Sequence, residues 1–498
     1  MKIVVIGGGT AGVMASTYFK SYWADLVEVV SIYDHAKPGI GVGESLTMMF
    51  DNYLRGVGVT TVELVKHCNA TIKLGLKFKN WTKPDHWWFH NFHVNECIAQ
   101  SDIVSQNFNL IEAYDMATGT YDGGSGYNKF YFENNIIPDA NNLLYRHALH
   151  VDATLVGRYI EGKFKDRIKT IDAIVENVEV ENNNIKSIRL NTGEIITADL
   201  FVDCTGYQRA LISQLNPEWI DISDQLPTDR TIPNPIFKHY DYIPPYTTAE
   251  ATKNGWILDV PLSNRRGTGY VYSSKFMTDE EAKIDFNAWL LKNHNVELQS
   301  DRVIKFNNGY FKESWIGNCV AVGLASGFVE PLEATSLHHT YLQLDIMTKL
   351  NNFNPLPMDR RSYNKIIQDI YKNSFEYIRH FYNTDRTDSE FWRYLTNNKP
   401  EWLLELEEKM STSYLNNFDS ISTSDVKMFT SINFNCIAYG HGKYTNQENI
   451  KKYLTTKYLQ KYAEQASHRN RQIKNNVHPT PVDHRQWVDS ILNNKDII

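Results

Sequence analysis

The chain opens with Ile3-Val4-Val5-Ile6-Gly7-Gly8-Gly9-Thr10-Ala11-Gly12, a β-branched run that leads directly into glycines. Such a run predicts a strand buried on both faces. The spacing Gly7-x-Gly9-x-x-Gly12 is the dinucleotide fingerprint, whose glycines permit a tight turn, close approach of a pyrophosphate and close packing of helix on strand. We therefore predict that Gly7, Gly9, Thr10, Ala11 and Gly12 bind a phosphate at a helix N-terminus. The alternative is a glycine-rich turn without a nucleotide.

A second strand is predicted from Leu26 to Ile32, and Tyr33-Asp34 follows it. An acidic side chain about twenty residues beyond the last glycine can bind a ribose hydroxyl. Asp34 is therefore a predicted cofactor-binding residue.

Two later segments favour FAD over NAD. Residues 197–206 and 319–325 each read as a buried strand followed by a glycine, Gly206 and Gly323. Flavoproteins with a two-part nucleotide domain return to the flavin through such elements, so Gly323 is a further predicted cofactor-binding residue. No second fingerprint follows a strand, which indicates that reducing power arrives from another protein. Direct hydride transfer, as in some single-fingerprint hydroxylases, stays open as an alternative.

The composition excludes several classes of protein. With 51 Lys+Arg against 58 Asp+Glu in 498 residues, the net charge is −7, and no basic stripe predicts a nucleic-acid partner. No apolar run reaches the roughly 18 residues of a membrane span, and a strand begins directly after Met1-Lys2, so we expect a cytoplasmic protein without a membrane partner. Five well-separated cysteines without a CxxC predict neither a disulfide framework nor a metal site.

The coarse pattern predicts several lobes. A helix is expected at residues 153–160 and a hairpin across 178–196, joined by Glu181-Asn182-Asn183-Asn184. Residues 51–145 read as an aromatic-rich irregular insertion, residues 211–310 as a mixed sheet, and the region beyond Pro331 as helical.

Further motifs occur in a fixed order along the chain. They are Gly41-Val42-Gly43-Glu44, Lys73 within residues 68–81, residues 148–153, Gly255-Trp256 followed by Val260-Pro261, residues 267–273, Phe328-Val329-Glu330-Pro331-Leu332-Glu333, and His380-Phe381-Tyr382 through Phe391-Trp392. Together with the fingerprint they resemble the flavin-dependent tryptophan halogenase family, from Gly7 to about Gly440.

The resemblance implies an α/β fold: a Rossmann-like FAD-binding domain of the flavin monooxygenase and halogenase type, a mixed-sheet substrate region and a mostly helical C-terminal cap. Residues 1–354 would form the FAD-binding and halogenation module, and residues 355–498 the substrate-side cap. Within the module, the nucleotide-binding parts are expected at 1–50, 146–210 and 311–354, and the substrate-covering parts at 51–145 and 211–310.

The resemblance also implies a chemistry. In that family, FADH2 from a separate flavin reductase, oxygen and a halide ion yield hypohalous acid, which reaches a lysine beside an aromatic substrate. This implies that Lys73 and Glu333 are catalytic, since an amine can hold the oxidant and a carboxylate can orient it and accept the ring proton. Read locally, Lys73 could instead be a solvated lysine near Lys77 and Lys79, and Glu333 a helix-start acid.

Other roles follow from the same resemblance. Gly43 and Glu44 would contact the flavin, the backbone at Thr335 and Ser336 would bind halide, and His90 with Phe92 would pack around the substrate. No metal is implied.

Three positions depart from the family pattern. Ala334-Thr335-Ser336 stands where a run ending in glycine is usual, so we expect bromide or iodide to be used better than chloride. Leu258 replaces a tryptophan in the segment 256–261, which keeps the hydroxylase alternative open. Thr430 replaces a tryptophan that binds free tryptophan in the C-terminal region. We therefore expect electron-rich aromatic or heteroaromatic substrates, such as phenols and indoles, rather than free tryptophan.

Two alternatives remain beside the halogenase. One is a flavin-dependent aromatic monooxygenase, and the other is a flavin-binding family member without turnover. The natural substrate, the ring position attacked, the reductase and the oligomeric state, with a homodimer among the options, are left open by the sequence.

Overall fold

The structure is a computed structural model of the 498-residue chain. It describes residues 1–36, 44–91, 113–115, 117–118, 129–138, 147–350, 359–412, 415, 422–443, 454, 456–477 and 481–494. The chain forms two compact units. Unit 1 comprises Met1–Ala70, Val151–Asp229 and Lys305–Phe375, and unit 2 comprises Thr71–His150, Arg230–Ile304 and Glu376–Ile498.

Unit 1 is built on a six-stranded sheet in the order β21-β22-β13-β1-β2-β9. The central strand β1 runs parallel to both neighbours, with Ile3 opposite Leu200 and Lys2 opposite Glu28. Only β21, at the edge, runs antiparallel. The strands are β1 (Lys2–Ile6), β2 (Glu28–Tyr33), β9 (Lys169–Asp172), β13 (Leu200–Asp203), β21 (Trp315–Ile316) and β22 (Cys319–Ala321).

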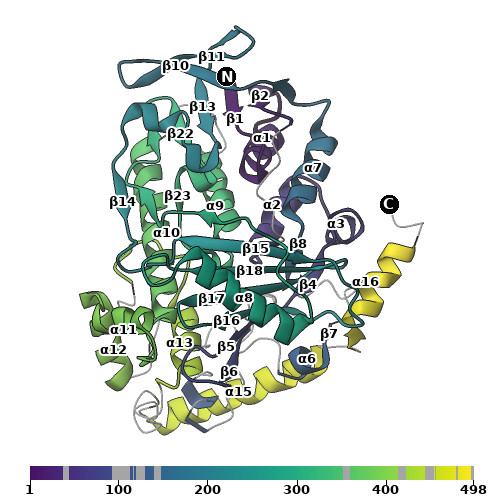
Figure 1. The fold of residues 1–498 in the computed structure, drawn as a ribbon, viewed down its shortest axis with the longest axis vertical. Helices are drawn as coiled ribbons and strands as arrows, with labels where there is room; N and C mark the ends of the chain where they lie inside the picture. Colours follow the sequence, from purple (N-terminus) through teal and green to yellow (C-terminus); the bar gives the residue numbers. More distant parts are fainter. Residues whose placement is uncertain are drawn as a thin grey trace. The chain divides into compact units, whose positions relative to one another are not determined.

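Helices and two small sheets complete unit 1. Helix α1 packs against α7 and α9 (Figure 1). The hairpin β10–β11 turns at Asn182 and Asn183, which both adopt positive φ, as a two-residue hairpin turn requires. The elements are α1 (Thr10–Trp23), α2 (Phe50–Gly56), α3 (Thr61–Cys68), α7 (Ala153–Phe164), α9 (Thr335–Lys349), β10 (Val175–Glu181), β11 (Asn184–Leu190), β12 (Ile195–Ile196), β14 (Trp219–Asp221), β20 (Gly309–Phe311) and β23 (Gly327–Phe328).

The core of unit 1 covers one face of the main sheet. Buried side chains of β1, β2 and β13, such as Val4, Ile32 and Phe201, pack with Ile188 of β11. The β-branched residues of β1 are therefore buried on both faces of the sheet, as the sequence predicted. Val4 lies in the core just described, and Ile3 and Val5 are fully buried on the opposite face.

The main sheet of unit 2 is mixed and has seven strands in the order β19-β15-β18-β17-β16-β5-β6, with β19 (Ile304–Lys305) at one edge. Strand β5 pairs in parallel with β16 and antiparallel with β6. Helix α8 packs over this sheet through Ala282, Phe286 and Leu290. The strands are β5 (Gly75–Lys79), β6 (Trp87–Asn91), β15 (Arg230–Ile236), β16 (Tyr246–Ala251), β17 (Gly255–Pro261) and β18 (Arg266–Tyr272), and the helix is α8 (Asp279–His294).

Two small strand pairs and several helices complete unit 2. Strand β4 (Thr71–Lys73) pairs antiparallel with β8 (Ala148–Val151), and β7 (Ile136–Ile137) pairs with β24 (Val482–Asp483). Helix α10 (Arg360–Phe381) ends in this unit, which also holds α6 (Lys129–Asn134), α11 (Glu390–Asn397), α12 (Glu401–Thr412), α13 (Ser431–Gly440), α15 (Lys457–Val477) and α16 (His484–Asn493).

Most of the predicted elements are confirmed, and one expectation is wrong. The described part of residues 51–145 is largely regular, with helices α2, α3 and α6 and strands β4, β5, β6 and β7. Helix α3 begins at a capping box in which Thr60 and Glu63 satisfy each other's backbone N–H groups. The aromatic content of this region reflects its place in a packed sheet rather than irregular backbone.

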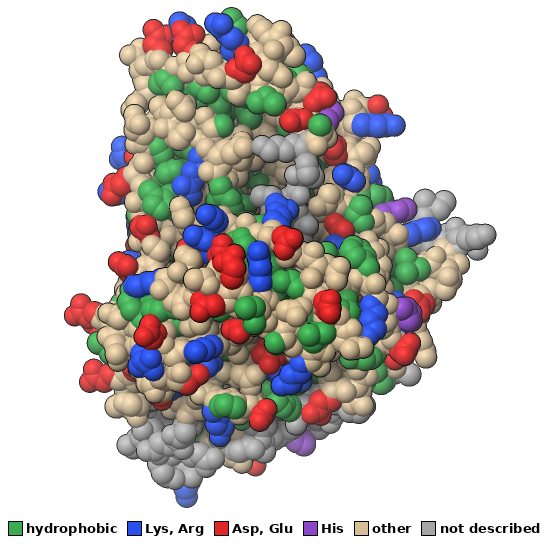
Figure 2. All heavy atoms as spheres, viewed as in Figure 1, with side chains coloured by type: hydrophobic (Ala, Val, Ile, Leu, Met, Phe, Trp, Pro, Cys, Tyr) green, Lys and Arg blue, Asp and Glu red, His purple; other side chains and the backbone are tan. Residues whose placement is uncertain are grey.

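The predicted domain boundary near residue 354 stays a prediction. On the face drawn in Figure 2, acidic and basic side chains are intermixed. Of the described helices, none combines the length and apolar character that a membrane span requires.

Candidate functional site

The glycine turn after β1 has the geometry of a dinucleotide cradle. Gly7 adopts a φ of +116°, and a Cβ on Gly12 would lie 1.8 Å from the Gly7 carbonyl oxygen, so only glycines let α1 approach β1 this closely. Gly9 is the residue before α1, it is exposed, and a Cβ there would meet nothing within 4 Å. The open space at a helix N-terminus fits the pyrophosphate of a flavin nucleotide.

Gly323 lies against the same turn. It adopts a φ of +67°, and a Cβ on it would lie 2.8 Å from the Cβ of Ala11. Its backbone N–H donates to Oε1 of Gln343 on α9 at 2.9 Å. Unit 1 therefore brings together the fingerprint and the glycine that follows β22, although more than 300 residues separate them.

Asp203, at the end of β13, shapes the backbone that follows this strand. Its buried carboxylate accepts hydrogen bonds from the backbone N–H groups of Thr205, Leu211 and Ile212 at 3.0, 2.8 and 2.9 Å. The sequence pattern marked the strand and its glycine, but it did not single out this carboxylate.

Two acidic residues were predicted to contact the cofactor, Asp34 and Glu44. Asp34 follows β2, is partly buried, and accepts a hydrogen bond from the N–H of Ala36 at 2.9 Å. Glu44 lies in β3 (Glu44–Ser45) and is also partly buried. Burial raises the pKa of Glu44 to about 7, and the nearby Asp152 carboxylate adds to the rise. Gly43 lies outside the described residues.

The predicted halide site lies at the start of α9. Glu333 is 5% exposed, Ala334 adopts a φ of +57°, and the helix begins at Thr335 without a side-chain cap. Thr335 is fully buried, and its Oγ1 has no hydrogen-bond partner among the described residues. An uncapped helix N-terminus and a spare buried hydroxyl are together suited to an anion.

Lys73 ends strand β4 in unit 2, and its side chain is 1% exposed. The neighbouring lysines behave differently. Lys79 forms an ion pair with Glu250 at 2.7 Å, and the Lys77 ammonium lies 4.8 Å from the centre of the Trp87 ring. The interpretation of Lys73 as a solvated lysine is therefore wrong, because a lysine is rarely buried without a specific role for its charge.

A series of three buried hydrogen bonds lies beside Lys73. The Thr71 hydroxyl donates to the Pro261 carbonyl at 2.6 Å, so it must accept from Nδ1 of His150 at 3.0 Å. Nε2 of His150 then accepts from the Thr247 hydroxyl at 3.0 Å. Burial, and next the charge of Lys73, lower the pKa of His150 well below its ordinary value, so the imidazole stays neutral.

These residues were missed by sequence reasoning. His150 belongs to one of the motifs that resemble the family, residues 148–153. No pattern in the sequence connects it to Thr247, which lies 97 residues away.

The predicted substrate residue His90 is buried in β6. Its Nδ1 lies 3.5 Å from the hydroxyl of Tyr377, whose ring stacks on Phe429 with 3.8 Å between centroids. Tyr377 and Phe429 are a stacked, buried aromatic pair beside His90 that the sequence did not single out. Phe92 lies outside the described residues.

Thr430 has a structural role at a position where the family pattern has a tryptophan that binds the substrate. It precedes α13 and forms a capping box with Asn433, and its side chain is exposed. A tryptophan at this position could not cap the helix in this way.

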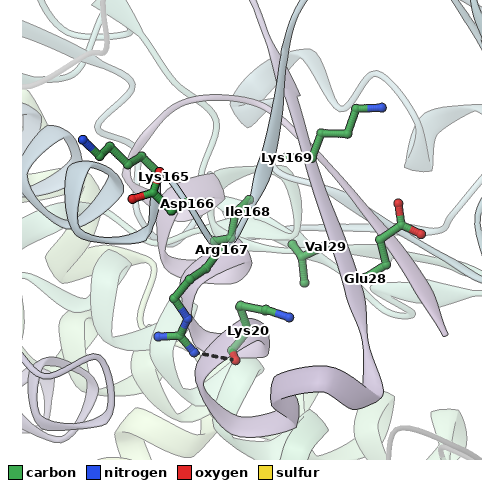
Figure 3. Close-up of a pocket in the computed structure, with 8 residues that line it drawn as sticks. All are labelled: Lys20, Glu28, Val29, Lys165, Asp166, Arg167, Ile168 and Lys169. Carbon is green, nitrogen blue, oxygen red and sulfur yellow. Dashed lines mark hydrogen bonds between the residues drawn. The ribbon is translucent and has the colours of Figure 1, made fainter.

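A surface pocket of about 370 Å³ in unit 1 is lined by basic side chains but is not a candidate site (Figure 3). It lies by Glu28, at the amino end of β2, whereas nucleotides bind at the carboxyl ends of parallel strands. Two of its four cationic side chains donate to backbone carbonyls, Lys20 to that of Ala24 and Arg167 to that of Lys20.

The chain is similar in sequence to known proteins. A family model described as tryptophan halogenase matches residues 2–455. The chain is 32% identical over 435 residues to tryptophan 7-halogenase RebH from Lentzea aerocolonigenes, covering 79% of this chain and 78% of that protein. It is 29% identical over 422 residues to tryptophan 6-halogenase SttH from Streptomyces toxytricini, covering 79% and 80%.

Solved structures show the same fold. A tryptophan halogenase from Shewanella frigidimarina matches with a TM-score of 0.84 at 20% identity, covering 99% of this chain and 97% of that one. The α/β fold class that the sequence predicts is confirmed.

The raised pKa of Glu44 predicts a pH-dependent stability. Between its ordinary value of 4.5 and about 7, the folded state keeps a proton that the unfolded state releases, so the unfolding free energy falls as pH rises through this window. Relative to Glu44→Gln, the flavin-free wild type should lose roughly 1–3 kcal/mol between pH 4.5 and pH 8. Urea unfolding of both proteins at several pH values measures this, and parallel curves would contradict it.

Proposed function

Because the chain belongs to the tryptophan halogenase family and is therefore a flavin-dependent oxidoreductase, we propose that it halogenates electron-rich aromatic substrates through an active-site lysine. The observation that carries the proposal is the burial of Lys73, which is 1% exposed on β4 beside a neutral histidine. A solvated lysine would give no support to this chemistry.

The flavin would be held by unit 1. Gly7, Gly9 and Gly12 leave the N-terminus of α1 open to the pyrophosphate, Gly323 borders the same turn, and Asp34 would bind the ribose. When bound and reduced, FAD supplies the two electrons that turn oxygen and halide into hypohalous acid. We propose that a separate flavin reductase delivers FADH2, because the sequence holds a single dinucleotide fingerprint.

The halide would be held at the start of α9. The backbone N–H groups at Thr335 and Ser336 open this helix, and the Thr335 hydroxyl is a buried donor without a described partner. A chloride or bromide ion accepts several hydrogen bonds and favours the positive end of a helix dipole. Thr335 and Ser336 can therefore hold a halide without a formal positive charge.

Lys73 would receive the oxidant and Glu333 would assist it. The ammonium group can donate a hydrogen bond to hypohalous acid, or the free amine can take the halogen as a haloamine with release of water. The carboxylate of Glu333 would orient the hypohalous acid and remove the proton from the cationic ring that forms after halogen transfer. The pairing of these two residues is part of the proposal.

The acceptor would be a small aromatic other than free tryptophan. His90, Tyr377 and Phe429 provide a buried aromatic surface in unit 2, whereas Thr430 serves as a helix cap. A site with stacking surfaces but without dedicated polar partners for an amino acid discriminates weakly against other flat rings. We therefore propose phenols and indoles as substrates.

The function is tested by the masses of the products. We expect reduced FAD, oxygen and bromide to give brominated phenols and indoles, recognised by the isotope pair of bromine, with smaller yields from free tryptophan. A product that gains oxygen in place of bromine would identify a monooxygenase. No product from any aromatic would favour a flavin-binding protein without turnover, and tryptophan outperforming every other acceptor would contradict the substrate class.

The role of Lys73 predicts a selective loss. Lys73→Met keeps most of the buried volume but removes the amine, so halogenation should fall at least about 100-fold while FAD affinity is unchanged. Lys79→Met is the matched control, since Lys79 forms a partly exposed ion pair worth little free energy. Wild-type halogenation rates in Lys73→Met would refute the lysine mechanism.

The halide site predicts a change in halide dependence. Thr335→Val removes a buried hydroxyl donor, so the KM for bromide should rise roughly tenfold, in line with a lost hydrogen bond to an ion. Thr348→Val is the control on the same helix, because the Thr348 hydroxyl already donates to the Asp345 carbonyl.

When bromide and chloride compete at equal concentrations, we expect the wild type to incorporate bromide in preference to chloride. A dominant chlorinated product would contradict that preference.

A further inference from the structure

The C-terminal helix begins with a histidine that reaches the strand of Lys73. His484 is fully buried, and its Nε2 accepts a hydrogen bond from the backbone N–H of Ile72 at 3.0 Å. Its Nδ1 faces the carbonyl oxygen of Ile243, also at 3.0 Å. The two bonds require a neutral imidazole with its proton on Nδ1. Burial lowers the pKa of His484 to about 3, which agrees with that state.

Strand β4 needs such a partner because it is only three residues long. On one edge it pairs with β8, with Thr71 opposite His150 and Lys73 opposite Ala148. The N–H of Ile72 is bonded to the His484 side chain, and the N–H of Leu74 donates to the Pro245 carbonyl at 2.7 Å. The amides on both sides of Lys73 are therefore anchored, and one anchor is an imidazole that comes from 412 residues further along the chain.

The C-terminal segment that carries His484 is itself held firmly within unit 2. Strand β24 pairs with β7, and the N–H of His484 donates to the Asn135 carbonyl at 3.2 Å. The Asp483 carboxylate caps α16 by accepting from the N–H of Gln486 at 2.9 Å. The Arg485 guanidinium donates to the Ser263 carbonyl at 3.0 and 3.1 Å. The imidazole is thus presented from a fixed backbone.

We propose that His484 is a positioning residue that holds β4 in the register and orientation in which Lys73 can receive and pass on the halogen. This inference rests on the proposed function of Lys73. It assigns a task in halogen transfer to a helix that follows residues 2–455, the range that the family model matches. A displacement of about 1 Å in a reacting group can lower a rate about 100-fold, so a single strand anchor can control the yield.

The test compares His484→Phe with His484→Gln in the full chain supplied with FADH2, oxygen, bromide and a phenol. Phenylalanine keeps the ring but leaves the Ile72 N–H without an acceptor, whereas glutamine offers an oxygen at a similar reach. We expect His484→Phe to give about 10- to 100-fold less brominated product per oxygen consumed, with unchanged oxygen consumption and FAD affinity. His484→Gln should recover most of the yield.

A measurement that does not depend on activity reports on the strand directly. In His484→Phe, hydrogen exchange in the peptide that carries residues 70–76 should be faster than in the wild type, and in His484→Gln it should be close to wild type. His239→Phe is the matched control, because His239 is exposed and its side chain is 73% accessible. It should change neither the yield nor the exchange.

The outcomes separate this inference from the proposed function. If Lys73→Met is inactive while His484→Phe couples oxygen consumption to bromination as the wild type does, the positioning role is overturned and the lysine mechanism stands. If Lys73→Met brominates normally, the proposed function fails and the positioning role fails with it. If both His484 variants lose FAD affinity, His484 is a determinant of folding, and the positioning role is again overturned.

Discussion

The burial of the Lys73 ammonium group is the constraint around which its part of unit 2 is organised. Removing a charged side chain from water is costly, and lysines are among the residues least often buried completely. The histidines around β4 do not add to this cost at neutral pH. Burial lowers the pKa of His150 far below its ordinary value and that of His484 to about 3, so both rings stay uncharged and act only through hydrogen bonds. The result is one desolvated amine on a fixed strand, an environment in which a lysine departs most from its behaviour at a surface.

Unit 1 meets a different requirement, which is to leave backbone donors open to anions. At Gly9 the start of α1 is open because glycines let the helix approach β1, and at Thr335 the start of α9 is open because no side chain caps it. The turn before α9 is also unusual, since Ala334 holds a positive φ that a residue with a Cβ seldom adopts. Within three residues, this turn places the buried carboxylate of Glu333 next to the uncapped helix end. The local backbone geometry thereby sets an acid beside the proposed halide site.

The sequence predicts the structural features that depend on neighbouring residues in the chain. The strand-glycine-helix unit, the hairpin turn at Asn182 and Asn183, and the helix that begins at Thr335 each follow from a few adjacent residues, and all are confirmed. The contacts around Lys73 could not be predicted, because His150, Thr247 and His484 are joined to β4 only through tertiary packing. The aromatic-rich segment was misread for the same reason: Trp88 and Phe78 stack across paired strands, and no local pattern reveals that their strands belong to one sheet.

Two side chains of the C-terminal region, Thr430 and His484, have a similar structural role. Thr430 is engaged in capping α13, and His484 is engaged in holding β4, so both side chains serve the local backbone rather than an amino-acid substrate. These two side chains are not available to a ligand, so in the proposed reaction recognition of the substrate would depend on rings such as Tyr377 and Phe429, which stack on each other. Stacking is tolerant of the identity of a flat ring, whereas the position of the lysine is not tolerant of small displacements. It follows that, in the proposed reaction, the range of substrates and the efficiency of halogen transfer are set by different residues of unit 2 and can be altered separately.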